Sequence, residues 1–371
     1  MRDPKTTKDT LHLDNLVITE SPIEKIESSH KTVQSKIVEK HKPRVKSDLD
    51  VRNVGNEDFQ SVMNYNAHFE PHITKDIYKE GFTVERNEAC EREEKILLTV
   101  IVISAPDHFK QREAIRRSWG QSAETVLFTF LVGMSENESV SRDVMQETEI
   151  HKDIVINKIT DLYQNLSLKT LSAFHWLLKH CHGSEFLLKV DDDMFVQVEK
   201  ITAKINTILD TQSRPRLILG NISRGWKPVR NPKSKYRITE AQYPEDKFPD
   251  FATGPSYLVS LQAAREIYQA AMEFKYIHLE DVFLTGVVAD SLDISRLDVH
   301  EFKNNAVRVP AQFMGCTIQN SVTIHKVEPD EQRELYELAK NPNCGRPDKK
   351  HIALQTKKLI KTALKNERHF V

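Results

Sequence analysis

The pattern of apolar and polar positions changes abruptly near Lys95. Up to about residue 94, polar and charged residues dominate, and the apolar residues are scattered without a sustained period. The run KILLTVIVIS, from Lys95 to Ser104, is almost continuously apolar and β-branched, which is typical of a strand buried on both faces. We therefore expect a stem or loosely ordered extension over residues 1–94, a folded domain over 95–345 and a basic tail over 346–371.

Strand-like and helix-like segments alternate in the first half of this domain. Apolar runs predict strands at 95–104, 126–133, 153–157, 185–190 and 216–220. Apolar residues spaced three and four apart predict helices at 107–120, 166–181 and about 198–208. Such alternation predicts an α/β fold with a Rossmann-like, mostly parallel sheet flanked by helices, in which ligands bind beyond the carboxyl ends of the strands. A further strand is expected at 256–260, and helices at about 261–274 and from 280 onward.

Composition describes a globular protein without a dominant charge. The 371 residues are 39% hydrophobic, enough to bury one substantial core or two modest ones. Charged residues make up 29%, but the net charge is only -1, so no overall field points to nucleic acid as a partner. The four cysteines are far apart and lack the CxxC spacing of structural zinc sites. In an oxidising compartment they allow two disulfides in any of three pairings.

Three Asn-X-Ser sequons predict N-glycosylation and therefore a secretory compartment, at Asn137, Asn165 and Asn221. No segment approaches the ~20 apolar residues that span a bilayer, and the first thirty residues lack the basic start and apolar middle of a signal peptide. These observations conflict, so either the protein is cytosolic and the sequons arise by chance, or this sequence lacks an N-terminal piece that would carry the chain across a membrane.

Three consecutive carboxylates, Asp191, Asp192 and Asp193, directly follow the apolar run EFLLKV. Charges ~6 Å apart repel by roughly 3 kcal/mol at an effective dielectric near 20, so the cluster favours a bound cation. In an extended segment Asp191 and Asp193 point the same way, and two such carboxylates suit Mn²⁺ or Mg²⁺ bridging a nucleotide. The alternative is an acidic, solvated turn.

Further charged residues recur in short motifs. Arg112 and Arg116 lie four apart on one helical face, where they contact either phosphate or carboxylates. Glu280 and Asp281 stand at a predicted helix start, where capping accounts for one acid but less well for two. His325 ends an apolar stretch and is either a metal ligand or an ordinary core or surface histidine.

Taken in order, the motifs RxxxRxxW, strand plus DDD, ED at a helix start and a late histidine resemble the β-1,3-galactosyltransferase family of inverting glycosyltransferases (glycosyltransferase family 31). The resemblance covers roughly Lys95 to Pro329. It includes DLYQNLSLKT at 161–170 and FPDFATGPSYLVS at 248–260. Pro255 departs from the family pattern, which usually has glycine there. The resemblance implies a fold of the GT-A type.

The same resemblance implies roles for individual residues. A UDP-sugar would bind with Mn²⁺ or Mg²⁺ held by Asp193, Asp191 and His325. Donor contacts would come from Arg112, Arg116, Lys189, Asp191 and Asp192. Asp281, with Glu280 beside it, would act as the general base that takes the proton of the acceptor hydroxyl.

The implied activity is β-1,3-hexosyl transfer, with galactose moved from UDP-galactose to a glycan acceptor on protein or lipid. The alternatives are N-acetylglucosamine transfer from UDP-N-acetylglucosamine and a catalytically silent relative that only binds glycan or nucleotide. A metal nuclease is disfavoured because no basic patch accompanies the acids, and no nucleic acid partner is expected. The family implies a single-pass type II membrane protein of the Golgi lumen.

Overall fold

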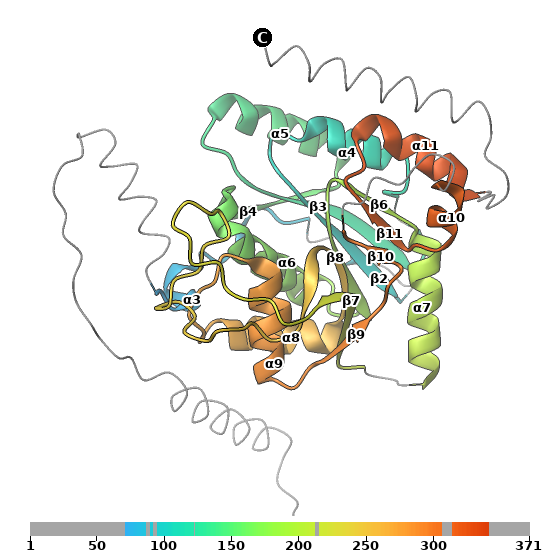
Figure 1. Ribbon diagram of the computed structural model, residues 1–371. Coiled ribbons are helices and arrows are strands. Elements are labelled where there is room, and N and C mark those ends of the chain that lie inside the picture. Colours follow the sequence, from blue (N-terminus) through green and yellow to red (C-terminus); the bar gives the residue numbers. More distant parts are fainter. Residues whose placement is uncertain are drawn as a thin grey trace, which may run out of the picture. The chain divides into compact units, whose positions relative to one another are not determined.

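An eight-stranded sheet forms the centre of the computed structural model, which describes residues 71–86, 90–91, 95–121, 123–211, 215–305 and 314–340 (Figure 1). The strand order is β1-β4-β3-β2-β5-β8-β7-β9. The strands are β1 (Phe82–Val84), β2 (Leu98–Ser104), β3 (Val126–Met134), β4 (Ile154–Thr160), β5 (Phe186–Asp191), β7 (Leu217–Ser223), β8 (Phe251–Ser260) and β9 (Ser295–Asp298). Only β1 and β8 run against their neighbours, so the predicted mostly parallel α/β sheet is confirmed.

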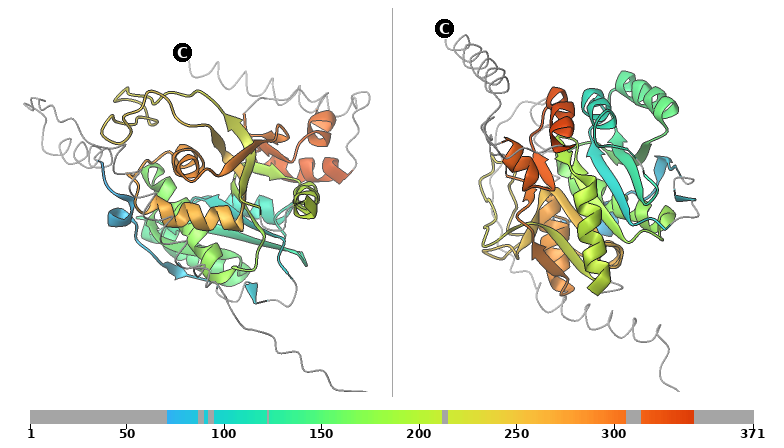
Figure 2. Two further views of the ribbon diagram at one scale, coloured as in Figure 1. Left: turned by 90° about the horizontal axis from the view of Figure 1, so that it is seen from below. Right: turned by 90° about the vertical axis from the view of Figure 1, so that its right-hand side faces the viewer.

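Helices cover both faces of this sheet (Figures 1 and 2). The longer helices are α4 (Phe109–Arg116), α5 (Glu138–His151), α6 (Leu166–His180), α7 (Val198–Thr211), α8 (Leu261–Ala271) and α11 (Pro329–Lys340). The shorter ones are α3 (Thr74–Ile77), α9 (Ala289–Ser291), α10 (Met314–Gln319) and the 3₁₀-helix η2 (Tyr163–Asn165). A π-helix, η3, spans Asp281–Val288. Within the described residues, no helix has the length and apolar character needed to cross a membrane.

One apolar core lies between the sheet and helices α4, α5, α7 and α11. Each of these helices contributes a buried residue to it, namely Ile115, Val144, Ile201 and Leu335. The strands contribute alternate residues, because side chains of a strand point to opposite faces in turn. On the other face α6 and α8 pack against the sheet and against each other. Burial on both faces explains why β2 reads as a continuous apolar run.

A second, three-stranded sheet lies beside the first and has the order β10-β11-β6. Its strands are β6 (Met194–Val196), β10 (Phe302–Lys303) and β11 (Thr323–His325). β6 and β11 pair antiparallel, with His325 opposite Met194. This pairing brings His325 beside Asp193, the residue that precedes β6. The small sheet therefore joins two chemically important positions that are far apart in the sequence.

The sheet also contains features that the sequence pattern did not predict. β1 pairs with β4, so part of the segment expected as stem belongs to the sheet, and the domain begins before Lys95. A three-residue strand is too short to show a period. Residues 1–70 and 341–371 lie outside the described part, so the stem and tail predictions stay predictions. The strand expected at 256–260 begins at Phe251 and runs antiparallel between β5 and β7.

Pro255 lies within β8 where the pairing is irregular. The register with β7 shifts between Gly220 and Ile222, and residue 255 is paired in neither flanking ladder. A proline, which has no N–H to donate, is tolerated at such a bulge. The bulge bends the Thr253–Ser256 backbone out of the regular ladder, directly beside the acidic residues described next.

One disulfide, Cys90–Cys181, joins the segment before β2 to the end of α6. It selects one of the pairings that the sequence left open. Cys316 is also disulfide-bonded, and Cys344 lies outside the described residues.

Candidate active site at the carboxyl end of β5

The aspartate triplet lies at the carboxyl end of β5, where the parallel sheet was expected to bind a ligand. Asp191 is the last residue of β5 and pairs with Ile103 of β2. Asp192 and Asp193 form the turn into β6. The Asp192 carboxylate accepts a hydrogen bond from Nδ1 of His108, which precedes α4, at 2.8 Å. The triplet therefore divides its contacts among three different parts of the fold.

Lys189 is the cation at the centre of the site. Its side chain is 0% exposed, and its ammonium contacts Asp191 Oδ1 at 2.7 Å, the Gly254 carbonyl at 2.7 Å and Glu280 Oε2 at 3.4 Å. Burial alone would lower the pKa of Lys189, but the Asp191 and Glu280 carboxylates outweigh it and raise the pKa. Burial raises the pKa of Asp191, and Lys189 opposes that rise. Lys189 therefore connects the end of β5 to the bulge of β8 through Gly254, and to the residue before η3 through Glu280.

Asp281 opens the π-helix η3 and is the partly exposed acid of the Glu-Asp pair. Its Oδ2 accepts from the Gly254 N–H at 3.0 Å, and its Oδ1 accepts from the Val282 N–H at 2.9 Å. Burial raises the pKa of Asp281, while these two N–H groups oppose the rise. The helix start thus holds the carboxylate in place, but burial makes it more basic than the sequence suggested. A fixed, partly exposed carboxylate of raised pKa suits a general base.

Glu280 is almost completely buried, 2% exposed, and faces the protein interior. Its Oε1 accepts a 2.5 Å hydrogen bond from the hydroxyl of Tyr257 on β8, and Oε2 faces Lys189. Burial raises the pKa of Glu280 to about 7; Lys189 opposes the rise, and Asp281 adds to it. Because its oxygens are committed within the protein, Glu280 supports the site from behind while Asp281 remains accessible.

Asp193 and His325 form a second pair on the small sheet. His325 Nε2 lies 3.3 Å from Asp193 Oδ2, and Nδ1 donates to the Asn304 carbonyl at 2.7 Å. A carbonyl only accepts, so Nδ1 carries a proton and Nε2 is left facing Asp193. Burial opposes protonation of His325, but Asp193 raises its pKa overall.

Asn304 fixes this pair relative to the β8 bulge. Its side-chain amide donates to Thr253 O at 3.1 Å and to Ser256 O at 2.7 Å, and its Oδ1 accepts from the Ser256 hydroxyl. The backbone of Asn304 holds His325 while its side chain holds the bulge whose glycine contacts both Lys189 and Asp281. Nothing in the sequence marked Asn304. Gly254 and Tyr257 belong to the segment at 248–260 that resembles the family. Their position in that segment was the sequence feature that could have identified them as site residues.

The predicted metal ligands are only partly brought together. Asp193 and His325 are adjacent, whereas Asp191 Oδ1 is engaged by Lys189. Among the described residues, no three His, Cys, Asp or Glu side chains are grouped closely enough to hold an ion. The pair nevertheless fits one. A histidine whose second nitrogen donates to a backbone carbonyl is oriented as metal-binding histidines are, and Mg²⁺-type ions commonly take few protein ligands beside substrate phosphates.

Arg112 and Arg116 form buried ion pairs with acidic residues of neighbouring elements. All five N–H groups of the Arg112 guanidinium donate within the protein, to Glu147 and to Ser104, Ala105 and Pro106. Arg116 pairs with Glu147 at 2.7 Å and with Asp153 at 2.7 Å. Of the two contacts considered from the sequence, phosphate and carboxylate, both arginines make the contact with carboxylates. Arg112 holds the loop after β2 in place, next to the carboxyl end of β5.

The three predicted glycosylation sites differ in their surroundings. Asn137 is exposed and caps α5, with its Oδ1 accepting from the Ser139 and Val140 N–H groups. Asn165 is partly buried and its side-chain NH₂, the group that a glycan would modify, donates to the Thr160 carbonyl. Asn221 is partly buried in β7. Of the three asparagines, the exposed Asn137 is therefore favoured as the site of a glycan.

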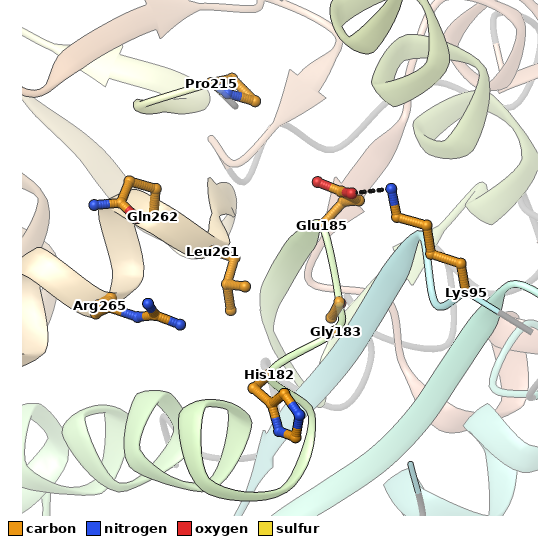
Figure 3. Close-up of a pocket in the computed structure, with 9 residues that line it drawn as sticks. Lys95, His182, Gly183, Glu185, Pro215, Leu261, Gln262 and Arg265 are labelled. Atoms are coloured by element: carbon orange, nitrogen blue, oxygen red, sulfur yellow. Dashed lines mark ion pairs between the residues drawn. The ribbon is translucent and has the colours of Figure 1, made fainter. Parts of the chain in front are cut away.

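A cavity of ≈ 460 Å³ opens at the other end of β5, lined by Lys95, Glu185 and Arg265 among others (Figure 3). Two of these lining residues, Lys95 and Glu185, form an ion pair with each other. Glu185 precedes β5 and Asp191 ends it, so the length of the strand separates this cavity from the acidic site. None of the predicted site residues lines it.

The fold and site together define a glycosyltransferase: acidic groups at the carboxyl edge of a parallel sheet, and a separately fixed carboxylate beside them. The galactosyltransferase family model matches residues 110–300, and the chain belongs to this family. The chain is 29% identical to β-1,3-galactosyltransferase 1 of Homo sapiens and of Mus musculus over 269 residues, or 71% of this chain and 80% of the relative. β-1,3-Galactosyltransferase 5 of Homo sapiens is 29% identical over 251 residues, or 66% of this chain and 78% of the relative. A bifunctional glycosyltransferase structure, WbbM, matches with a TM-score of 0.35 at 10% identity, covering 66% of this chain and 52% of that one.

Proposed function

We propose that the protein transfers galactose from UDP-galactose to a hydroxyl group of a glycan acceptor, on glycoprotein or glycolipid, with inversion and formation of a β-1,3 linkage. Membership of the galactosyltransferase family and the relatives named β-1,3-galactosyltransferase support the sugar and the linkage. The observation that carries the proposal is the position of Asp281. It is a partly exposed carboxylate held by two backbone N–H groups and connected through Gly254 to the Lys189–Asp191 pair.

In the proposed reaction Asp281 accepts the proton of the acceptor hydroxyl. The acceptor oxygen then forms a bond to the anomeric carbon, while the bond from that carbon to the diphosphate oxygen breaks and UDP leaves with the electron pair. Inversion requires the base and the leaving group on opposite faces of the sugar. The role of Glu280 is structural, because Tyr257 and Lys189 hold its oxygens away from a substrate.

Asp193 and His325 would hold a divalent cation, Mn²⁺ or Mg²⁺, together with oxygens of the diphosphate. When bound, the cation stabilises negative charge on the leaving UDP. The paired Nε2 and Oδ2 atoms and the Asn304 contact behind them support this assignment. Asp191 as a third ligand remains a prediction, since its second oxygen would have to turn toward the ion while Lys189 holds the first.

Donor contacts are proposed for Asp191 and Asp192, with His108 orienting Asp192. Lys189 would act indirectly, because its side chain is fully buried and its ammonium is held by Asp191, Gly254 and Glu280. Arg112 would act indirectly, since its hydrogen bonds fix the loop after β2 and leave none of its N–H groups for the nucleotide. We place the enzyme in the oxidising lumen of the secretory pathway, and specifically in the Golgi. The Cys90–Cys181 disulfide supports an oxidising compartment.

The test is a donor and acceptor screen with purified protein. UDP release is measured with UDP-galactose, UDP-N-acetylglucosamine and UDP-glucose, each with Mn²⁺ or EDTA and with a panel of β-glycoside acceptors. The proposal expects acceptor-dependent UDP release that is greatest with UDP-galactose and Mn²⁺. Preference for UDP-N-acetylglucosamine would reassign the sugar. UDP binding without turnover of any donor would indicate a catalytically silent protein.

A further inference from the structure

Two tyrosines with unusually exposed rings lie together near the catalytic segment. Tyr163, on η2, is 39% exposed, and Tyr236, in the loop between β7 and β8, is 47% exposed. Their ring centroids are 6.4 Å apart and the rings meet edge to face at 78°. The ammonium of Lys235 lies 5.1 Å from the Tyr163 centroid and 4.9 Å from that of Tyr236. These three residues are called the tyrosine platform below.

The platform is fixed to the segment that leads into Asp281. The Tyr163 ring contacts the ring of His278 at 6.1 Å, and His278 lies three residues before Asp281. His278 is buried, and its Nε2 donates to the backbone carbonyl of Lys235 at 3.0 Å. The same histidine therefore holds both halves of the platform. Aromatic residues such as tyrosine are enriched in interfaces relative to the rest of the protein surface.

Further contacts make η2 and the catalytic segment one rigid unit. The Tyr276 hydroxyl donates to the Gln164 carbonyl at 2.6 Å, and the Ser167 hydroxyl donates to the Ile277 carbonyl at 2.6 Å. Burial raises the pKa of Tyr163, and the neighbouring Tyr236 hydroxyl and Asp281 carboxylate raise it further.

The contacts above anchor the platform to the segment that leads into Asp281. The proposed cation pair, Asp193 and His325, is on the small sheet, whereas Tyr236 belongs to the loop of residues 224–250. Figure 1 shows that loop, drawn in yellow, well apart from β6 and β11. Asp281 takes its proton from the acceptor, so groups anchored to the Asp281 segment are placed to hold that molecule.

We propose that the tyrosine platform binds the sugar rings of the acceptor saccharide, an inference that rests on the proposed function. The C–H face of a pyranose packs on an aromatic face, whose electron-rich surface favours the partly positive hydrogens. The Lys235 ammonium, which has three donors and no ion pair within the described part of the chain, donates to the sugar hydroxyls. Aromatic faces and a flexible donor thus select a saccharide over an unglycosylated peptide.

The platform is tested by acceptor kinetics of Tyr236→Ala and Tyr236→Phe. We expect Tyr236→Ala to raise the acceptor KM by about tenfold, which is typical of truncating an aromatic contact. Tyr236→Phe keeps the ring and should stay much closer to the wild type. The affinity for UDP with Mn²⁺, measured by calorimetry, reports separately on the donor site. An unchanged acceptor KM in Tyr236→Ala would overturn the platform, as would an equal rise in both variants.

Tyr336 offers a matched control. Its ring also carries a lysine ammonium, that of Lys340 at 4.6 Å, but it lies on α11, which Figure 1 shows far from the yellow loop. Tyr336→Ala should leave the acceptor KM unchanged, and a comparable increase there would contradict the assignment.

Saccharide binding can also be followed without turnover. Saturation-transfer NMR on methyl β-glycosides of galactose and N-acetylglucosamine, with UDP and Mn²⁺ present, detects contact with aromatic protons. We expect a transfer signal in the wild type that Tyr236→Ala reduces. If the wild type binds glycosides through Tyr236 but uses no UDP-sugar, the proposed transfer fails and the platform stands. If the wild type turns over UDP-galactose with acceptors and Tyr236→Ala changes neither the acceptor KM nor the transfer signal, the proposed transfer stands and the platform fails.

Discussion

Replacing Lys189 by methionine removes a cation that contacts both Asp191 and Glu280. The side chain is fully buried, and its ammonium has contacts of 2.7 Å with Asp191 and with Gly254 O. Removing one partner of a buried ion pair typically costs about 3–5 kcal/mol, because the remaining charges stay buried without compensation. We expect a loss of that size in the free energy of unfolding at pH 8, measured by urea denaturation in EDTA without nucleotide.

The loss should shrink as the pH falls. Some carboxyl groups have a higher pKa in the folded protein than in the unfolded chain. Such a group begins to destabilise the folded protein when the pH rises above its unfolded pKa. The destabilisation stops growing once the pH exceeds its folded pKa. Without Lys189 the pKa values of Asp191 and Glu280 rise further, and each added unit costs about 1.4 kcal/mol at high pH. Protonation at pH 5 therefore returns part of the stability. In the wild type, Glu280 already has a raised pKa of about 7, so its ionisation also lowers the stability as the pH rises.

Lys200→Met is the control for this experiment. The Lys200 ammonium contacts backbone carbonyls, those of Ile318 and Gln319 at 2.9 Å, instead of pairing with a buried carboxylate. Its removal should cost the same at pH 5 and pH 8. The electrostatic reasoning is refuted if Lys189→Met also costs the same at both pH values, or if it costs less than Lys200→Met at pH 8.

Three further predictions concern pH, glycosylation and the disulfide. Burial raises the pKa of Asp281 above ~3.9, the usual aspartate value. Below this raised pKa, kcat/KM for the acceptor should fall about tenfold for each pH unit, because the base becomes protonated. A pH profile that stays flat down to pH 4 would exclude this base. Mass spectrometry of protein secreted from animal cells should find a glycan at Asn137 and none at Asn165, whose NH₂ group is hydrogen-bonded; the opposite pattern would show that this part of the site opens before modification. Cys90→Ser should lower the free energy of unfolding by about 4–5 kcal/mol, because the bond to Cys181 closes a loop of 91 residues, and an unchanged thermal midpoint would show that the loop is constrained by other contacts.

Local pattern was sufficient to predict five strands and three helices between Lys95 and Gly220 and the place of the aspartates at a strand end, but it missed helix α5 and the short strand β6. These features depend on periodicity within about ten residues, which a single sequence shows directly. The reversed direction of β8 was not predictable, because strand direction depends on pairing between distant segments. β1 was missed because its three residues are too few to show alternation.

The site divides in the same way. Asp281 was recognised from its motif, but the raised pKa and the Gly254 contact arise from a bulge in β8 that no local signal reveals. Arg112 and Arg116 were expected near the nucleotide, yet the carboxylates to which they donate hydrogen bonds lie 31 or more residues away in sequence. The pairing of Asp193 with His325 likewise depends on the small sheet. The sequence therefore supplied candidate residues, and only the tertiary contacts show which of them lie together.

The most direct measurement compares the wild type with Asp281→Asn. Product formed from UDP-galactose is analysed by NMR for linkage and anomeric configuration, and calorimetry follows UDP binding with Mn²⁺. The wild type should form a β-1,3-linked galactoside, while Asp281→Asn should lose about 10²–10⁴-fold in turnover, as expected for a missing general base, and still bind UDP normally. Normal turnover in Asp281→Asn, or an α-linked product from the wild type, would contradict the proposed mechanism.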